Sequence, residues 1–385
     1  METENMKRFD DIRPVLDSEV KEVTRQLTDN PTFKRLVQPL IKPIPWLLFS
    51  TRMRSSKSVH DFQRKIIYPF MKRIIDKTTA ELSGSGFEKI KKDEGYLYIS
   101  NHRDIVLDAA FLNILFFDKK IDTCEIAIGD NLLIHPWITD LVRLNKSFIV
   151  KRKVSVREMI ATSKQLSEYI HDTIFRRKQS VWLAQREGRA KDSNDKTQTS
   201  LLKMLTLYDS ANPAEALRAL NIVPLSITYE YDPCDYLKAQ EFQQKRDIPD
   251  FKKSQSDDIE NMKTGIMGFK GRVKFNFGES IKHSIGAIDA DEKKSRVFEI
   301  VADAIDAEIY KNYEFFPINY VAYDMMTGKS DFADRYSRKD QSDFETYLNA
   351  QVAKVNLPDR DEKFLRGKII EMYANTLKNH LSVIS

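Results

Sequence analysis

The chain has 385 residues but only two cysteines, Cys124 and Cys234. They stand in no spacing typical of a metal site, and two cysteines alone cannot build a disulfide framework in a chain of this length. We therefore expect no resident metal, and a reducing cytoplasm as the compartment in which the protein works.

Long apolar runs are missing as well. The two longest, at residues 44–49 and 105–117, are too short or too interrupted to cross a bilayer. The chain opens with a charged segment and not with the apolar core of a signal peptide. We expect no transmembrane helix.

A dominant charge is absent too, because 62 lysines and arginines face 57 acidic residues, which leaves a formal net charge of +5. The basic residues are nevertheless clustered, at 51–57, 148–157 and 174–178. Such clusters suit phosphate-bearing substrates, acidic carrier proteins or anionic membranes. They lack interleaved aromatic residues at a readable spacing and any known nucleic-acid motif, so we expect no nucleic-acid partner.

The apolar pattern divides the chain into three regions. Residues 1–80 read as helical, residues 81–285 alternate short apolar strands with helices, and residues 286–385 return to helices. The alternation predicts an α/β fold with a largely parallel central sheet flanked by helices, and with helical N-terminal and C-terminal extensions. The expected strands are 96–100, 124–129, 147–152, 180–185, 221–231 and 272–281. The charged segment 235–263, between the last two strands, is expected to be exposed.

Within the first region, residues 42–54 combine prolines, Trp46 and a short apolar run with several basic residues. A segment of this kind can lie in a membrane interface, with Trp46 at the level of the lipid headgroups. The alternative is a connector packed on the rest of the protein. The sequence leaves both possibilities open.

The densest cluster of ionisable side chains, His102, Arg103 and Asp104, interrupts the apolar stretch 96–112. His-Arg-Asp also occurs in protein kinases, but a kinase needs an asparagine five residues after the aspartate, where this chain has Ala109. The glycines just before residue 87 also lie too close to His102 to leave room for a nucleotide-binding lobe. These features exclude a kinase.

His102 instead fits a general base at the carboxyl end of a strand, where α/β folds usually carry their chemistry. A carboxylate about one turn into a following helix would bind one ring nitrogen and fix the tautomer. The other ring nitrogen would then be free to accept a hydroxyl proton. Asp104 and Asp108 are both close enough in sequence, and the alternative for His102 is a surface or helix-capping role.

Four segments and a following strand match the blocks of one superfamily in their order. The first carries the histidine and aspartate, the second an arginine before a phenylalanine-bearing strand, the third Glu-Gly followed by arginine, and the fourth a strand around a proline. The segments are 101–108, 129–152, 181–192 and 222–231, and the strand with Phe-Gly-Glu is 273–281. Over about residues 85–285 the chain resembles the glycerolipid acyltransferases, the superfamily of glycerol-3-phosphate and lysophosphatidic acid acyltransferases.

The resemblance implies an O-acyltransferase of phospholipid biosynthesis. Such an enzyme moves a fatty acyl group from acyl-CoA or an acyl-carrier protein to a hydroxyl of glycerol 3-phosphate or of a lysophospholipid such as lysophosphatidic acid. His102 would deprotonate the hydroxyl, and Asp108 or Asp104 would stabilise the imidazolium that forms. We favour Asp108, because the residues after it resemble those that follow the family's aspartate. A thioester carries a good leaving group, so neither a metal nor a cofactor beyond the acyl donor is implied.

The resemblance also implies a site for the acceptor's phosphate, which fixed cations must bind, and guanidinium groups bind phosphate with two hydrogen bonds. Arg189 is the first candidate, with Glu187 and Gly188 shaping its loop. Further candidates from the second block are Arg143, Lys151 and Arg152. For Arg143 and Lys151 the alternative is ordinary surface charge.

An enzyme of this class would work at a membrane surface, so the resemblance implies a peripheral protein on the inner face of the cell membrane. Two other functions remain open. One is an acyltransferase for a different acceptor, such as an amino-acid lipid, and the other is a non-catalytic protein of the same fold that binds lipid or membrane. The sequence does not specify the position acylated, the acyl-chain length, the choice between CoA and carrier protein, or the oligomeric state.

Overall fold

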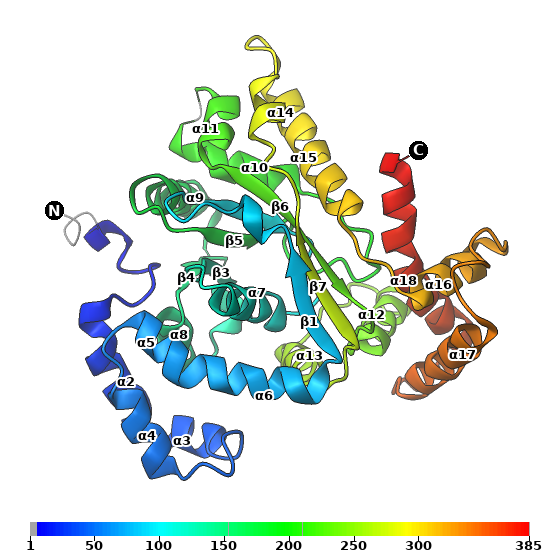
Figure 1. The fold of residues 1–385 in the computed structure, drawn as a ribbon, viewed down its shortest axis with the longest axis horizontal. Helices are drawn as coiled ribbons and strands as arrows, with labels where there is room; N and C mark the ends of the chain where they lie inside the picture. The colour runs from blue at the N-terminus through cyan, green and yellow to red at the C-terminus, as the bar shows by residue number, and fades with distance from the viewer. Residues whose placement is uncertain (1–5, 153, 210, 385) are drawn as a thin grey trace.

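A computed structural model describes residues 6–152, 154–209 and 211–384, and Figure 1 shows its seven-stranded sheet with helices on both faces. The strand order is β1-β7-β6-β2-β5-β3-β4. Neighbouring strands are parallel except β6 and β7, which are antiparallel. The strands are β1 Glu81–Ser85, β2 Leu97–Ser100, β3 Glu125–Gly129, β4 Ser147–Val150, β5 Val181–Ala184, β6 Ile222–Tyr229 and β7 Arg272–Phe277. The predicted α/β fold with a largely parallel sheet is confirmed.

Strand β1 was not predicted. Its sequence, Glu-Leu-Ser-Gly-Ser, has no apolar alternation, because it lies at the edge of the sheet and is not fully buried. Gly84 allows the close pairing with β7, since a Cβ placed there would lie 2.3 Å from the carbonyl oxygen of Phe275.

Helices cover both faces of the sheet (Figure 1). One face packs against α6 Tyr68–Thr78 and α7 Leu107–Asp118. The other face packs against α9 Val156–His171, α10 Thr199–Leu205, α11 Pro213–Ala219, α14 Lys282–Gly286 and α15 Lys294–Lys311. Of these, α7 is apolar on nearly all sides and is therefore almost completely buried.

The N-terminal helices form a small core of their own against α8 Pro136–Leu144. They are α2 Val20–Asp29, α3 Pro31–Val37, α4 Trp46–Arg54 and α5 Val59–Phe62, and α5 continues through residues 63–67 into α6. The segment before them covers the exposed edge of β4, where the amide of Ile149 donates to the carbonyl of Ile12 at 2.8 Å.

The C-terminal helices form another core. It contains α16 Pro317–Thr327, α17 Arg338–Ala353 and α18 Glu362–Ile384 together with α12 Asp235–Asp247. The expectation that residues 235–263 are exposed is therefore wrong for the first two turns of α12. Charged side chains there are buried because they find partners inside the protein: Lys238 pairs with Asp232, and Asp235 accepts hydrogen bonds from two tyrosines.

Helix α13 Gln255–Met267 follows α12 and is mostly exposed, with only Asn261 and Gly265 buried. No helix in the described ranges is long and apolar enough to cross a membrane. Because β2, β5 and β6 are parallel, their carboxyl ends lie on the same side of the sheet. This side, the carboxyl edge, is distinct from the outer strands β1 and β4, and it carries the candidate site.

Candidate active site

The chain leaves the sheet at Asn101, directly after β2. The Asn101 side chain takes the place of a further strand residue: its Nδ2 donates to the carbonyl of Ile227, and its Oδ1 accepts from the amide of Ile227, both at 2.8 Å. Residues 101–106, the histidine loop, therefore begin from a fixed point at the edge of the sheet, and they end where α7 begins.

His102 and Asp108 form a hydrogen bond of 2.7 Å between Nδ1 and Oδ2. The same Oδ2 accepts the backbone amides of Arg103 at 2.6 Å and Asp104 at 3.0 Å. A carboxylate oxygen that accepts two amides requires Nδ1 to carry the ring proton, which leaves the lone pair on Nε2. Nε2 has no hydrogen-bond partner among the described residues, and the His102 side chain is 14% exposed, whereas Asp108 is fully buried. The predicted contact between a carboxylate and one ring nitrogen is confirmed, and its partner is Asp108.

Asp104 has a different place. Its Oδ1 accepts the amides of Val106 at 2.9 Å and Leu107 at 2.7 Å, so it caps the first turn of α7 and does not hold the imidazole. Burial, and then the neighbouring charge of Asp108, raise the pKa of the Asp104 carboxyl above its usual range.

Two aromatic residues at the same edge were missed by the sequence analysis. The Trp182 ring meets the His102 ring nearly edge-on, with centroids 5.7 Å apart, and its Nε1 donates to Ser100 Oγ at 3.0 Å. Burial, and then the charge of Asp108, raise the pKa of Tyr229 well above its usual value, so its hydroxyl stays protonated. Both lie in apolar strands whose sequence is typical of an ordinary core. Only the indole NH of Trp182 and the hydroxyl of Tyr229 could have indicated a place in the site.

Arg189 lies in residues 185–198, the arginine loop, which follows β5. It is only 9% exposed, and its Nη2 donates to Asn261 Oδ1 of α13 at 3.1 Å. Its Nη1 is buried without a hydrogen-bond partner in the part of the chain that the structure describes, and so are both polar atoms of the Gln185 amide. Unpaired buried donors are costly, so these atoms stand out from the paired groups around them.

Helix α13 covers this part of the edge. Besides Asn261, it brings Gly265 against the histidine loop, where a Cβ would lie 1.9 Å from Asp104 Oδ2. Helix α13 therefore contacts the histidine loop at Asp104 and the arginine loop at Arg189.

The structure places Lys151, Arg152, Glu187 and Gly188 farther out on the same edge. Arg152 and Glu187 form an exposed ion pair of 3.1 Å, and Lys151 pairs with Asp11 of the N-terminal segment. Gly188 has φ +68° and open space around it, so glycine is needed there for the backbone conformation. Lys151 and Arg152 follow β4, three strands and about 14 Å from β2.

Arg143 lies elsewhere. It is in the last turn of α8, shortly before β4 starts. It therefore lies at the amino ends of the strands, whereas His102 lies at their carboxyl ends. Its guanidinium donates to the carbonyls of Arg13 at 2.7 Å and Asp10 at 2.8 Å. Arg143 anchors the N-terminal segment, and this position does not fit the predicted contact with an acceptor phosphate.

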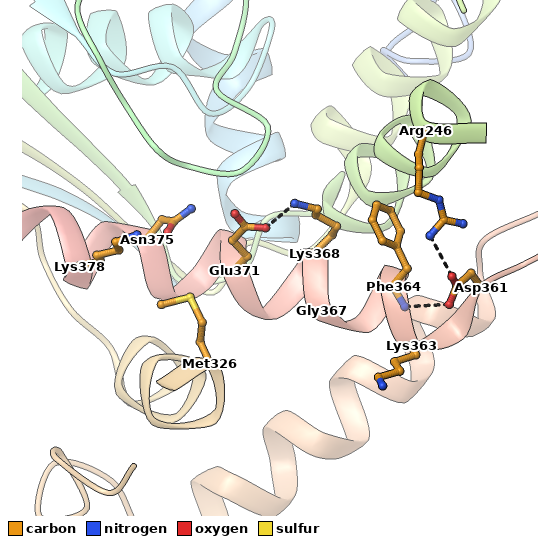
Figure 2. A pocket seen from close by; sticks show the side chains of 10 residues that line it. All are labelled: Arg246, Met326, Asp361, Lys363, Phe364, Gly367, Lys368, Glu371, Asn375 and Lys378. Atoms are coloured by element: carbon orange, nitrogen blue, oxygen red, sulfur yellow. Dashed lines mark hydrogen bonds and ion pairs between the residues drawn. The ribbon is translucent and has the colours of Figure 1, made fainter. Parts of the chain in front are cut away.

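A surface hollow of about 610 Å³ lies along α18 and contains none of the predicted site residues (Figure 2). Two of its cations already have partners, as the dashed lines in Figure 2 show: Arg246 pairs with Asp361 and Lys368 with Glu371.

Comparison with known proteins relates this edge to a family. A family model described as Acyltransferase matches residues 82–227, which include the histidine loop, Asp108 and Arg189. None of the curated proteins matches the chain. Among solved structures, the chain is similar to the 1-acyl-sn-glycerophosphate (LPA) acyltransferase PlsC from Thermotoga maritima, with 15% identity and a TM-score of 0.39 over 76% of this chain and 98% of that one.

The family match falls on the same segment as the ordered blocks of the sequence and the hydrogen-bonded His102–Asp108 pair. Residues 82–227 are therefore an acyltransferase domain, and His102, Asp108 and Arg189 lie within it.

Proposed function

We propose that the protein moves a fatty acyl group from an acyl thioester, acyl-CoA or acyl-carrier protein, to the hydroxyl of glycerol 3-phosphate or of a lysophospholipid such as lysophosphatidic acid. The observation that carries the proposal is the His102–Asp108 pair, which leaves Nε2 as an unshared acceptor at the edge of the sheet.

The chemistry follows from this geometry. Nε2 of His102 takes the proton of the acceptor hydroxyl as its oxygen attacks the thioester carbonyl, and Asp108 stabilises the imidazolium that forms. When the tetrahedral intermediate collapses, the carbon–sulfur bond breaks and the imidazolium returns the proton to the thiolate. The thiolate is a good leaving group, so the scheme includes no covalent acyl-enzyme and no metal or other cofactor.

Arg189 is the proposed contact for the acceptor's phosphate. Its unpaired Nη1 supports this, because a phosphate oxygen would satisfy a donor that the described protein leaves unsatisfied. Glu187 lies in the same loop, and its ion pair with Arg152 joins the loop to the end of β4.

We further propose that the protein sits on the inner face of the cell membrane through α3 and α4. The two helices and the turn between them expose Leu36, Leu40, Leu47 and Leu48, and Leu47 is 77% exposed. Trp46 is instead half-buried, with its ring 6.1 Å from that of Phe33. The leucines, and not Trp46, are thus the side chains available to enter the lipid interface.

The function is tested by crossing two donors, palmitoyl-CoA and palmitoyl-carrier protein, with several acceptors: glycerol 3-phosphate, lysophosphatidic acid, lysophosphatidylcholine and an amino-acid lipid. We expect product with at least one phosphate monoester, and His102→Ala to lower its rate by about 100-fold or more. Equal rates for His102→Ala and the unmodified protein would refute the proposal. Product only with the amino-acid lipid would reassign the acceptor.

Membrane binding is tested by flotation with vesicles of 70% phosphatidylcholine and 30% phosphatidylglycerol. We expect the double variant Leu47→Ser/Leu48→Ser to float less than the unmodified protein. The matched control is Met159→Ser/Ile160→Ser, which changes two exposed apolar residues on α9 and should leave flotation unchanged. Undiminished flotation of the leucine variant would remove α4 from the proposal.

A further inference from the structure

Arg103, next to the proposed base, is fixed at three points. Its backbone amide donates to Asp108 Oδ2 at 2.6 Å, and its guanidinium forms two hydrogen bonds with Asp195, at 3.0 and 2.6 Å. Its carbonyl oxygen accepts from Lys238 Nζ at 3.2 Å. The residue that orients the carboxylate of Asp108 is thereby tied to two other parts of the chain.

Asp195, in the arginine loop, is fixed in turn by the C-terminal region. The Tyr313 hydroxyl donates to Asp195 Oδ2 at 2.6 Å, and the Tyr310 hydroxyl donates to the Asp195 carbonyl. Arg103 and Asp195 are both buried. Burial opposes the charge of Arg103, but the negative charge of Asp195 outweighs it and raises the arginine's pKa, so the guanidinium stays charged.

The pair joins the two loops that carry the site. Arg103 belongs to the histidine loop and Asp195 to the arginine loop, 92 residues later. The supporting residues Lys238 and Tyr313 both lie beyond residue 227, where the family match ends. The parts of this chain outside the family segment therefore hold a loop inside it.

We propose that Arg103 and Asp195, supported by Tyr313, are positioning residues for the acyl transfer reaction: they hold the Arg103 amide on Asp108 and so keep His102 in the tautomer with the proton on Nδ1. This inference rests on the proposed function of His102. A two-point ion pair suits the task, because it fixes the direction of a side chain as well as its distance. Stability alone does not require it, since buried ion pairs can often be replaced by apolar residues at no cost.

The chain contains a matched control. Glu125, at the start of β3, pairs with Arg177 at 2.7 Å and accepts a hydrogen bond from the Tyr169 hydroxyl. These three residues repeat the combination of arginine, acid and tyrosine, but at the opposite edge of the sheet from His102. Glu125→Gln should therefore destabilise the protein as Asp195→Asn does, without reaching the site.

The experiment compares Asp195→Asn, Tyr313→Phe, Glu125→Gln and the apolar triple variant Arg103→Met/Asp195→Leu/Tyr313→Phe. For each, the thermal midpoint, kcat and KM are measured, together with the ¹⁵N shifts of the His102 ring, which report its tautomer. The His102 signals are assigned from their loss in His102→Gln.

We expect Asp195→Asn to lower kcat by about 10- to 100-fold at nearly constant KM and to give a mixture of His102 tautomers. Tyr313→Phe, the mildest change, should lower kcat a few-fold. The triple variant should regain thermal stability but not kcat, and Glu125→Gln should lose stability while keeping kcat and the tautomer.

Unchanged tautomer and kcat in Asp195→Asn and Tyr313→Phe would overturn the inference, and so would full kcat in the triple variant. The tautomer measurement separates this failure from that of the proposed function. If the unmodified protein acylated no acceptor, a tautomer shift in Asp195→Asn would still support the positioning role, and its absence would refute it.

Discussion

The histidine loop and the arginine loop lie at the same carboxyl edge of one sheet, yet they differ in how many of their buried polar groups have hydrogen-bond partners. In the histidine loop, the Nδ1 of His102, the guanidinium of Arg103 and the Oδ1 of Asp104 all have partners within the protein. In the arginine loop, the side-chain amide of Gln185 and the Nη1 of Arg189 have none among the described residues. The first loop has its polar groups paired within the protein, and the second leaves the donors that the proposed phosphate contact would use.

The largest expected effect concerns the two acids that follow His102, Asp104 in the histidine loop and Asp108 in the first turn of α7. Asp108→Asn should lower kcat on the order of 10³-fold, because a neutral amide does not stabilise the imidazolium and can turn its NH₂ toward Nδ1, which favours the wrong imidazole tautomer. Asp104→Asn should lower kcat by less than about 10-fold, since an amide oxygen still caps α7. Steady-state kinetics of the two variants check this, and a larger loss for Asp104→Asn would reverse the assignment.

A smaller effect is expected in the arginine loop. Arg189→Ala should lower kcat/KM for phosphate-bearing acceptors by about 10- to 100-fold, the value of charge-assisted hydrogen bonds, and should change acceptors without a phosphate monoester much less. Arg152→Ala, which removes an exposed ion pair with Glu187, should cost less than about 3-fold. Equal losses for both kinds of acceptor would show that Arg189 does not bind the phosphate.

The contact of α13 with both loops predicts a loss of stability. Gly265→Ala places a Cβ against Asp104 Oδ2, so either the carboxyl or the helix must move, at a cost of about 1–3 kcal/mol. Urea unfolding measures the change. Gly367→Ala in α18 is the control, because a Cβ there meets no atom within 4 Å and should not destabilise the protein. Equal stability of the two variants would contradict the close packing of α13 at Gly265 against Asp104.

The smallest effect is a change in the pH dependence of stability. Because the pKa of Asp104 is raised on folding, the folded protein keeps a proton that the unfolded chain has lost above its ordinary pKa of 3.8. Stability therefore falls as pH rises from that value to the raised pKa. Asp104→Asn lacks this loss, so its stability relative to the unmodified protein should increase with pH in urea unfolding between pH 4.5 and 8. A difference that stays constant with pH would contradict the raised pKa.

Much of the fold was predictable because buried parallel strands read as short apolar runs. Strand β1 escaped, since its Ser-Gly sequence is set by close pairing at an edge and not by burial. Helix α12 was misjudged as exposed because Lys238 and Asp235 look solvent-seeking in sequence, and only the folded chain shows their buried partners. The local sequence pattern thus predicts an element whose own side chains determine its structure and burial. It fails for an element whose structure or burial depends on partners far away in the sequence.

The same distinction applies to the site. His102 and Asp108 are six residues apart, so spacing made Asp108 a candidate beside Asp104, and only the family resemblance favoured Asp108. The contacts of Arg103 with Asp195 and of Arg189 with Asn261 join residues 92 and 72 positions apart, and no sequence spacing reports them. Arg143 was misplaced for the same reason, because its block does not reveal at which edge of the sheet the residue lies.

The most direct test of the account is the pH dependence of acyl transfer from acyl-CoA to the best acceptor, measured from pH 5 to 9 for the unmodified protein and for His102→Ala. If an imidazole held by Asp108 removes the hydroxyl proton, His102→Ala should be about 100-fold slower or more across this range. A His102→Ala variant with the same rate at every pH would contradict the central role of His102.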